Sequence, residues 1–159
     1  MIKTLFITFL VLFFNWVSLA DDLTLDDVSR LNETKINRII RVQDSSHIQE
    51  GLIYAIKHRL KVSIAGKRHS QGGHVVYKNG VVLDMTDFDK ILDINPKKQT
   101  ITVQTGISWA QIQEAVNPYG LAIKVMQSSN IFSVGGSISV NAHGRDPRYG
   151  PLIETINQM

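Results

Sequence analysis

Apolar residues recur every three to four positions between residues 46 and 59, and this spacing predicts an amphipathic helix. Three polar residues, Asp44-Ser45-Ser46, precede the run and are of the kind that caps a helix N-terminus. One side of the helix would face the core. The predicted apolar stripe comprises Ile48, Leu52, Ala55, Ile56 and Leu60.

Shorter apolar runs after this helix predict strands at 61–65, 80–85, 91–94 and 100–104. The turn Asn95-Pro96-Lys97-Lys98 joins the last two, so we expect these strands to pair as an antiparallel hairpin. A second helix is predicted to begin at the cap Ser108 and to end at Asn117-Pro118-Tyr119-Gly120. Strands are expected again at 121–125 and in the apolar run that begins at residue 131. This order predicts an α+β fold, with helices packed on a mixed sheet.

The first 20 residues have the pattern of an export signal. Lys3 supplies a positive charge, residues 5–17 are almost wholly apolar, and the small residues Ser18 and Ala20 precede the expected cleavage site. The alternative is an uncleaved membrane anchor, but Asn15 interrupts an apolar run that is shorter than the roughly 20 residues of a spanning helix. We expect an exported protein, periplasmic or secreted, without a membrane span after cleavage. Residues 21–37 are a lead-in segment, with at most one helical turn and no assigned chemistry.

Composition removes several classes of function. The chain has 159 residues, no cysteine, and a formal net charge of +3 from 17 basic and 14 acidic residues. Without cysteine there is no disulfide scaffold, thiol catalysis or thiolate metal site. The basic residues form no run longer than two, which disfavours nucleic-acid binding. No histidines or carboxylates stand at metal-ligand spacing, so we predict no metal site.

Two glycine-rich loops, 66–73 and 135–144, carry the candidate chemistry. Glycine lets a ligand approach the backbone closely, and successive amides in such turns form an anion site. The first loop adds Lys67, Arg68 and the hydroxyl of Ser70. Neither loop has the Gly-Lys-Ser/Thr of a Walker loop or the G-x-G-x-x-G fingerprint. The residues alone predict a pocket for a diphosphate or another anion, to which the second loop adds Ser137, Ser139, Asn141 and His143.

The five histidines differ in their expected roles. His47 and His58 stand at the two ends of the first predicted helix, off its apolar stripe, and are expected at the surface. His74 is either a loop residue or part of a pocket wall. His69 and His143 lie inside the glycine-rich loops, where an imidazole can face a ligand.

Aromatic residues and paired carboxylates have plainer expected roles. Trp109 and Tyr119 belong to a helix face and to the turn after it, where packing in the core is the expected role. Asp84 and Asp87 flank a strand end, where a carboxylate usually serves a turn. Nothing in their spacing indicates a two-carboxylate hydrolase site.

Four blocks of sequence resemble, in the same order, the FAD-binding domain of the vanillyl-alcohol oxidase / p-cresol methylhydroxylase (PCMH-type) family. The blocks are SIAGKRHSQGG at 63–73, VLDM at 82–85, ITVQTGISW at 101–109 and SVGGSISVNAHG at 133–144. They are most similar to those of alditol and aldonolactone oxidases and of decaprenylphosphoryl-ribose oxidases. The resemblance covers residues 38–159 and implies a domain of two α+β subdomains.

The resemblance also implies an FAD molecule extended between the two subdomains, with its diphosphate on residues 66–70 and 134–140. In many members the histidine of an Arg-His-Ser or Gly-His-Ser triplet is joined covalently to the flavin 8α-methyl group, and other members hold FAD without that link. His69 stands at this place, which makes a covalent link through it a hypothesis. The implied cofactor contacts are Gly66, Lys67, Arg68, His69, Ser70, Gln71, Gly135, Gly136, Ser137 and His143.

Family members take a hydride from a substrate C–H beside an alcohol or amine and pass the electrons to oxygen or another acceptor. The resemblance thus implies an FAD-linked oxidase or dehydrogenase for the CH–OH groups of a sugar-like or other alcohol. It stops before the second subdomain is complete and includes no substrate domain, so no catalytic residue is named and the chain alone is expected to be too short for catalysis. Two alternatives stay open: a truncated or split non-catalytic fragment, and a periplasmic module that binds an anion or sugar phosphate.

Overall fold

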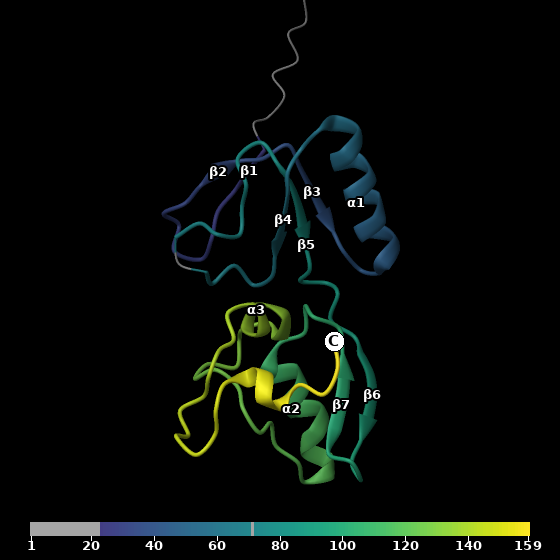
Figure 1. The fold of residues 1–159 in the computed structure, drawn as a ribbon, viewed down its shortest axis with the longest axis vertical. Coiled ribbons are helices and arrows are strands. Elements are labelled where there is room, and N and C mark those ends of the chain that lie inside the picture. Colours follow the sequence, from purple (N-terminus) through teal and green to yellow (C-terminus); the bar gives the residue numbers. More distant parts are fainter. Residues whose placement is uncertain (1–22, 71) are drawn as a thin grey trace, which may run out of the picture.

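The computed structural model describes residues 23–70 and 72–159, and the predicted export signal lies outside these ranges. The described chain forms two α+β halves, one above the other in Figure 1. The first half contains a parallel sheet in the order β3-β5-β4, built from β3 (Arg38–Arg41), β4 (Val62–Ala65) and β5 (Val81–Asp84). Helix α1 (Ser45–His58) follows β3 and packs against all three strands.

Helix α1 is confirmed, and its predicted apolar stripe is correct for three of five residues: Ala55 is buried, and Ile48 and Leu60 pack against the core of the first half. The stripe is wrong for Leu52 and Ile56, which are 44% and 78% exposed, and the fully buried residues of the helix are small, Gly51 and Ala55. The helix sits so close to the sheet that a Cβ at residue 51 would meet the side chain of Leu83. Because only small side chains fit at this distance, the larger ones lie to the sides of the contact.

Both predicted helix caps are confirmed. Asp44 accepts a hydrogen bond from the Ser46 amide at 2.8 Å and caps α1. Ser108 caps α2 (Trp109–Val116) in a capping box, in which the Ser108 hydroxyl accepts from the Gln111 amide and the Gln111 side chain accepts from the Ser108 amide. The predicted end of this helix is also correct, since a short 3₁₀ turn, η1 (Asn117–Tyr119), follows it.

The lead-in segment is more structured than expected. Two short strands, β1 (Thr24–Leu25) and β2 (Thr34–Lys35), pair antiparallel, and the Ile36 amide donates to the Leu23 carbonyl at 2.8 Å. The sequence reasoning predicted neither these strands nor β3, because each is short and carries polar residues. Ile36 and Ile39 pack with Val82 on the face of the sheet away from α1.

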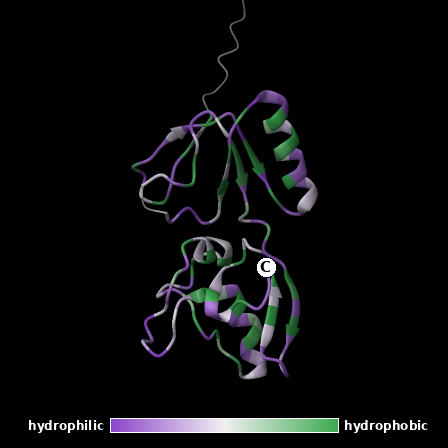
Figure 2. Ribbon diagram, viewed as in Figure 1, coloured by the Kyte–Doolittle hydropathy of each residue, from purple (hydrophilic) through white to green (hydrophobic). Residues whose placement is uncertain are grey.

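The second half contains the predicted hairpin of β6 (Ile91–Asn95) and β7 (Thr100–Val103). Its helices are α2, the short helix α3 (Val134–Ser139) and a 3₁₀ turn, η2 (Leu152–Thr155). Figure 2 shows apolar residues along the strands of the first half and mixed faces on the helices. The buried core of the second half consists of Ile107, Trp109, Ile112, Val116, Val125, Val134 and Leu152.

Three expectations for this half are corrected. Residues 121–125 form no strand, and the run from residue 131 enters helix α3 instead of a strand. Helix α3 forms because tertiary hydrogen bonds hold its start: the Val134 amide donates to the Ile107 carbonyl and the Gly135 amide to the Thr105 carbonyl. Tyr119 is 53% exposed and lies outside the core, whereas Trp109 is 5% exposed, as expected.

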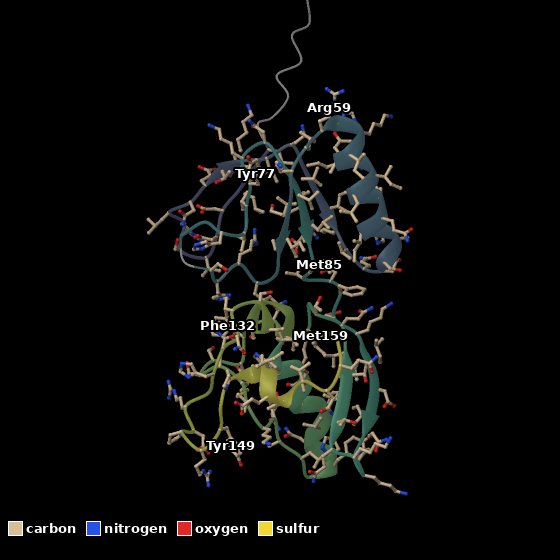
Figure 3. All side chains as sticks on the ribbon, in the orientation of Figure 1. Arg59, Tyr77, Met85, Phe132, Tyr149 and Met159 are labelled. Carbon is tan, nitrogen blue, oxygen red and sulfur yellow. The ribbon has the colours of Figure 1, made fainter. Side chains whose placement is uncertain are left out.

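The two halves meet along a narrow boundary. The Met85 amide donates to the Ala65 carbonyl in the first half, and the Gly106 amide donates to the Phe88 carbonyl at 2.7 Å as the chain enters the second half. Figure 3 places Met85 and Phe132 on opposite sides of this boundary. None of the helices in the described ranges has the length and apolar character needed to cross a bilayer.

Candidate functional site

The first glycine-rich loop and the start of α3 approach each other at this boundary, which brings together the two loops that the sequence nominated. A Cβ at Gly66 would lie 2.6 Å from the Ser133 Oγ, and a Cβ at Gly136 would lie 3.1 Å from the same oxygen. Ser133 therefore stands between the two loops. We call this contact of Gly66, Ser133 and Gly136 the loop junction.

Ser133 is a site residue that the sequence reasoning missed. It occupies the N-cap position of α3 and is 4% exposed, yet its side chain makes no capping hydrogen bond. The sequence signal was present, because a serine stands directly before the Val134-Gly135-Gly136 run. A hydroxyl that is not used to cap its helix can donate to an anion held at the loop junction.

Gly135 has a structural function as well as a place beside the junction. Its amide donates to the Thr105 carbonyl at 2.8 Å, and a Cβ at this position would lie 2.8 Å from the Thr105 Cβ. The amide is therefore engaged within the protein. Gly136 is exposed and follows it in the first turn of α3.

The two basic residues of the first loop have different surroundings. Arg68 adopts a left-handed backbone conformation, with φ of 57°. Its guanidinium donates to the Asp26 carbonyl at 3.5 Å, and its side chain lines a cavity of about 350 Å³ together with Asp26, Asp27 and Glu33. Lys67 is half-buried, and none of the ion pairs among the described residues includes it. Lys67 is therefore the loop cation that remains available for a bound anion.

His69 lies at the boundary between the halves. Its ring packs edge-on against Phe132, with ring centroids 4.9 Å apart and an interplanar angle of 86°. Its Nδ1 is buried and has no hydrogen-bond partner among the described residues. A buried ring nitrogen without a hydrogen bond is energetically costly, so this atom is suited to contact a bound ligand. Ser70 is half-buried in the same loop, and the predicted contact Gln71 lies outside the described residues.

Ser137 faces into the protein rather than toward the loop junction. It is 1% exposed, and its hydroxyl accepts from the Trp109 Nε1 at 2.9 Å. The same hydroxyl lies within hydrogen-bond distance of the Gln127 side chain and the Ser133 carbonyl. The side chain of this predicted contact is thus engaged in holding α3 on the core.

The other four histidines have surroundings that differ from those of His69. His143 is exposed, and its Nδ1 lies 2.8 Å from the Gly144 carbonyl oxygen. His47 lies 3.6 Å from Asp44 at the start of α1, and His58 is exposed and stacks on Tyr54, as expected for surface positions. His74 is an exposed loop residue. The described residues include no group of three or more His, Asp or Glu side chains that could hold a metal ion.

The arrangement suits an extended anionic ligand. The loop junction offers a close approach of backbone and a buried hydroxyl, and the half-buried Lys67 follows Gly66 directly in the chain. Together these groups can bind a phosphate or diphosphate. The unpartnered His69 ring nitrogen and Phe132 extend the same boundary with one polar atom and one aromatic face. A ligand that has a diphosphate joined to a planar ring would match both parts.

Comparison with protein families supports this chemistry. A model described as "FAD binding domain" matches residues 36–159, which include both glycine-rich loops and the residues of the loop junction. The match begins at residue 36, so the β1–β2 segment lies before it.

Two curated relatives illustrate the similarity. L-galactono-1,4-lactone dehydrogenase 2, mitochondrial, of Oryza sativa subsp. japonica is 30% identical over 147 residues, which are 92% of this chain and 25% of the relative. Glycolate oxidase subunit GlcD of Escherichia coli (strain K12) is 38% identical over 96 residues, which are 58% of this chain and 19% of that protein. The chain spans about a quarter of the length of the lactone dehydrogenases that it matches.

Solved structures show the same fold. Cholesterol oxidase from Brevibacterium sterolicum aligns with a TM-score of 0.62 and 21% identity, over 76% of this chain and 24% of that one. 6-hydroxy-D-nicotine oxidase from Arthrobacter nicotinovorans aligns with a TM-score of 0.57 and 20% identity, over 62% of this chain and 21% of that one. The expectation of a partial PCMH-type domain with α+β architecture is confirmed.

Proposed function

The chain belongs to the FAD binding domain family, and from that premise we propose that its loop junction holds the diphosphate of FAD in an oxidoreductase. The observation that carries this proposal is the approach of Gly66 and Gly136 to the same Ser133 hydroxyl. This contact lies within the matched residues and joins two loops that are about 70 residues apart in sequence.

The residues of the loop junction, and residues close to them in the sequence, have separate proposed parts in holding the cofactor. Gly66 keeps the loop surface open, since a larger residue would occupy the space beside Ser133. Lys67 supplies a positive charge with no competing carboxylate among the described residues. Ser133 supplies a hydroxyl donor, and Phe132 together with His69 forms a surface for the ring system. We place Arg68 and Ser137 in a supporting role, because their side chains are engaged with other parts of the protein.

FAD, when bound, accepts a hydride from a carbon atom that carries a hydroxyl or amino group. Two relatives are named for an aldonolactone and for glycolate, both of which contain CH–OH groups. We therefore propose a sugar-like or other small alcohol as the substrate of the whole enzyme. The proposed role of this chain is to bind and orient the cofactor. We assign none of the described residues to the catalytic base or to the substrate pocket.

His69 is the proposed point of covalent attachment. A ring nitrogen of His69 would hold the cofactor through a C–N bond to its 8α carbon. The link would replace one N–H and one C–H bond, and molecular oxygen would be the two-electron oxidant that takes up both hydrogens as hydrogen peroxide. Supporting observations are the position of His69 in its triplet and its buried, unpartnered Nδ1.

We also propose that the protein is exported, because residues 1–20 carry the charge, apolar stretch and small residues of a cleavable signal. The uncleaved anchor is the alternative. The mass of the protein purified from an expressing bacterium separates the two, since cleavage leaves Asp21 as the first residue.

Titration of the full chain with FAD, riboflavin and inorganic diphosphate, followed by flavin fluorescence and calorimetry, tests the diphosphate assignment. FAD should bind more tightly than riboflavin, which has no phosphate, and inorganic diphosphate should compete with FAD. Lys67→Ala should weaken FAD binding about tenfold, the ratio expected for one charge-assisted contact. The control Lys97→Ala removes an exposed lysine in the β6–β7 turn and should leave the affinity unchanged.

Each outcome has a defined meaning. Equal affinity for FAD and riboflavin would refute the diphosphate assignment. Binding of inorganic diphosphate without binding of FAD would favour the anion-binding module. Retention of colour by acid-precipitated protein, lost in His69→Ala, would support the covalent link, whereas flavin released into the supernatant by the unaltered chain would refute it.

A further inference from the structure

The N-terminal segment of the described chain is an ordered turn that packs on the first glycine-rich loop. We call residues 23–35 the N-terminal strap: strands β1 and β2 pair at its base, and residues 26–33 form its turn. In Figure 1 the strap lies on the side of the first half away from α1. It lies before the family match, which begins at residue 36, so the family resemblance assigns it no function.

Two adjacent aspartates organise the turn of the strap. Asp27 is 5% exposed and accepts hydrogen bonds from the Ser29 amide and hydroxyl and from the Asn32 side-chain amide. The Asp26 carboxylate accepts from the Asp27 amide at 2.8 Å and from the Asn32 amide at 3.0 Å. A buried carboxylate satisfied by this many donors is a built structural element and holds the turn in one conformation.

The N-terminal strap contacts the first glycine-rich loop at two places. The Val28 amide donates to the Arg68 carbonyl at 3.0 Å, and the Arg68 guanidinium donates back to the Asp26 carbonyl at 3.5 Å. Farther along the loop, a Cβ at Gly73 would lie 3.1 to 3.2 Å from the Asn32 side chain. The turn therefore touches the loop at residues 68 and 73, on either side of His69 and Ser70.

The contact at Arg68 has a conformational consequence. Arg68 has a φ of 57°, a left-handed conformation that side chains other than glycine seldom adopt without support. The strap supplies support through both the carbonyl and the side chain of this residue. Because Arg68 separates Lys67 from His69, its backbone conformation sets the directions in which these two residues leave the loop.

We propose that the N-terminal strap, acting through the Val28 amide and the turn around Asp27, positions residues 66–70 of the first glycine-rich loop for ligand binding. Val28 acts on the loop through Arg68, and Asp27 acts on the turn through Ser29 and Asn32, so both are positioning residues. The inference rests on the proposed function for the identity of the ligand. Its structural part, that the strap fixes the loop, can be measured without any ligand.

Hydrogen–deuterium exchange and FAD titration of the full chain test the proposal together. Val28→Pro removes the donor to Arg68, and the matched control Val28→Ala keeps the amide and shortens only a side chain that is 57% exposed. We expect Val28→Pro to accelerate exchange of the two amides that anchor the ends of the loop, Met85 on the Ala65 carbonyl and Val76 on the Gly73 carbonyl, in the absence of FAD. We also expect it to weaken FAD binding about tenfold, the ratio expected for one hydrogen bond. Val28→Ala should change neither quantity.

A second variant guards against a failure of Val28→Pro to fold. Asn32→Ala removes the donor to Asp27 and the contact beside Gly73, and leaves the Val28 amide in place. It should accelerate exchange of the same two amides. Unchanged exchange of these amides in a folded Asn32→Ala protein, with the same result in any Val28→Pro protein that folds, would overturn the proposal.

The two proposals can fail separately. If the unaltered chain does not bind FAD, the proposed function fails, while faster exchange of the two anchoring amides in the variants would still support the strap. If the unaltered chain binds FAD and the variants bind it equally tightly with unchanged exchange of these amides, the proposed function stands and the strap has no positioning role.

Discussion

The contact between Gly66 and Ser133 permits a test in which the sign of a stability change depends on one oxygen atom. In Gly66→Ala the new Cβ would lie 2.6 Å from the Ser133 Oγ, about 0.8 Å inside the 3.4 Å at which ordinary contact begins. The Ser133 Cβ lies 3.6 Å from the same point and causes no overlap. The strain therefore comes from the hydroxyl alone.

The magnitude follows from two opposing effects. Overpacking of this kind costs about 1–3 kcal/mol of unfolding free energy. Gly66 is not among the glycines with positive φ, so alanine fits its backbone conformation. Alanine also lowers the conformational entropy of the unfolded chain, which raises the unfolding free energy by about 0.4–1 kcal/mol. We expect Gly66→Ala to lower the unfolding free energy by about 1–2 kcal/mol. In a Ser133→Ala background the same change should be neutral or raise it by up to about 1 kcal/mol.

Urea unfolding of the four proteins of this double-mutant cycle, followed by circular dichroism, measures both values. The expected coupling between the two positions is about 1–3 kcal/mol. Additive effects, with Gly66→Ala equally destabilising in both backgrounds, would show that Gly66 and Ser133 do not meet. That result would also remove the geometric basis for joining the two glycine-rich loops in one site.

Three further predictions use calorimetry or chemical unfolding. Ser137→Ala should lower the unfolding free energy by about 1–3 kcal/mol, because it leaves the Trp109 Nε1 buried without its acceptor. Ser139→Ala, at an exposed position of the same helix, should lower it much less, and equal losses would contradict this reasoning. Gly106→Ala should destabilise the chain by more than about 3 kcal/mol, or prevent folding, since its Cβ would overlap a backbone carbonyl oxygen; a stable variant would refute the boundary geometry. Hydrogen bonds, chiefly from the Ser29 side chain, hold the pKa of Asp27 below its usual range. The contribution of Asp27 to the unfolding free energy is therefore complete above about pH 4 and is lost as the pH falls through the folded pKa. Asp27→Asn should make the unfolding free energy less sensitive to acid, and an unchanged pH profile would contradict this.

Local patterns predicted those elements whose boundaries are set by their own residues. Helix α1 has a side-chain cap at Asp44, α2 has a capping box at Ser108, and the β6–β7 hairpin has a turn-forming segment between its strands. In each case the stop and start signals lie next to the element. The periodicity also predicted the α+β class, and the family resemblance then added the two-subdomain FAD-binding fold and the cofactor.

Elements that depend on distant partners were missed. The residues of α3 include two glycines and β-branched side chains, and local propensity favoured an extended run. The helix forms where the carbonyls of Thr105 and Ile107 accept its first amides. The apolar stripe of α1 was wrong at Leu52 and Ile56 for a related reason, because the distance between the helix and the sheet, set at Gly51, decided which side chains are buried.

The candidate site also combines features set by local sequence with features set by distant contacts. Lys67 and Arg68 both carry a positive charge beside the predicted anion pocket, and the sequence pattern predicts the same role for both. The left-handed conformation of Arg68 and the carbonyl of Asp26 direct one of them to the strap, while Lys67 keeps no ion-pair partner among the described residues. We therefore expect the favourable charge beside the loop junction to depend on Lys67, and the shape of the loop to depend on Arg68. Loss of the lysine should act mainly on diphosphate affinity, and loss of the strap contact should act on every ligand that needs the loop in this conformation.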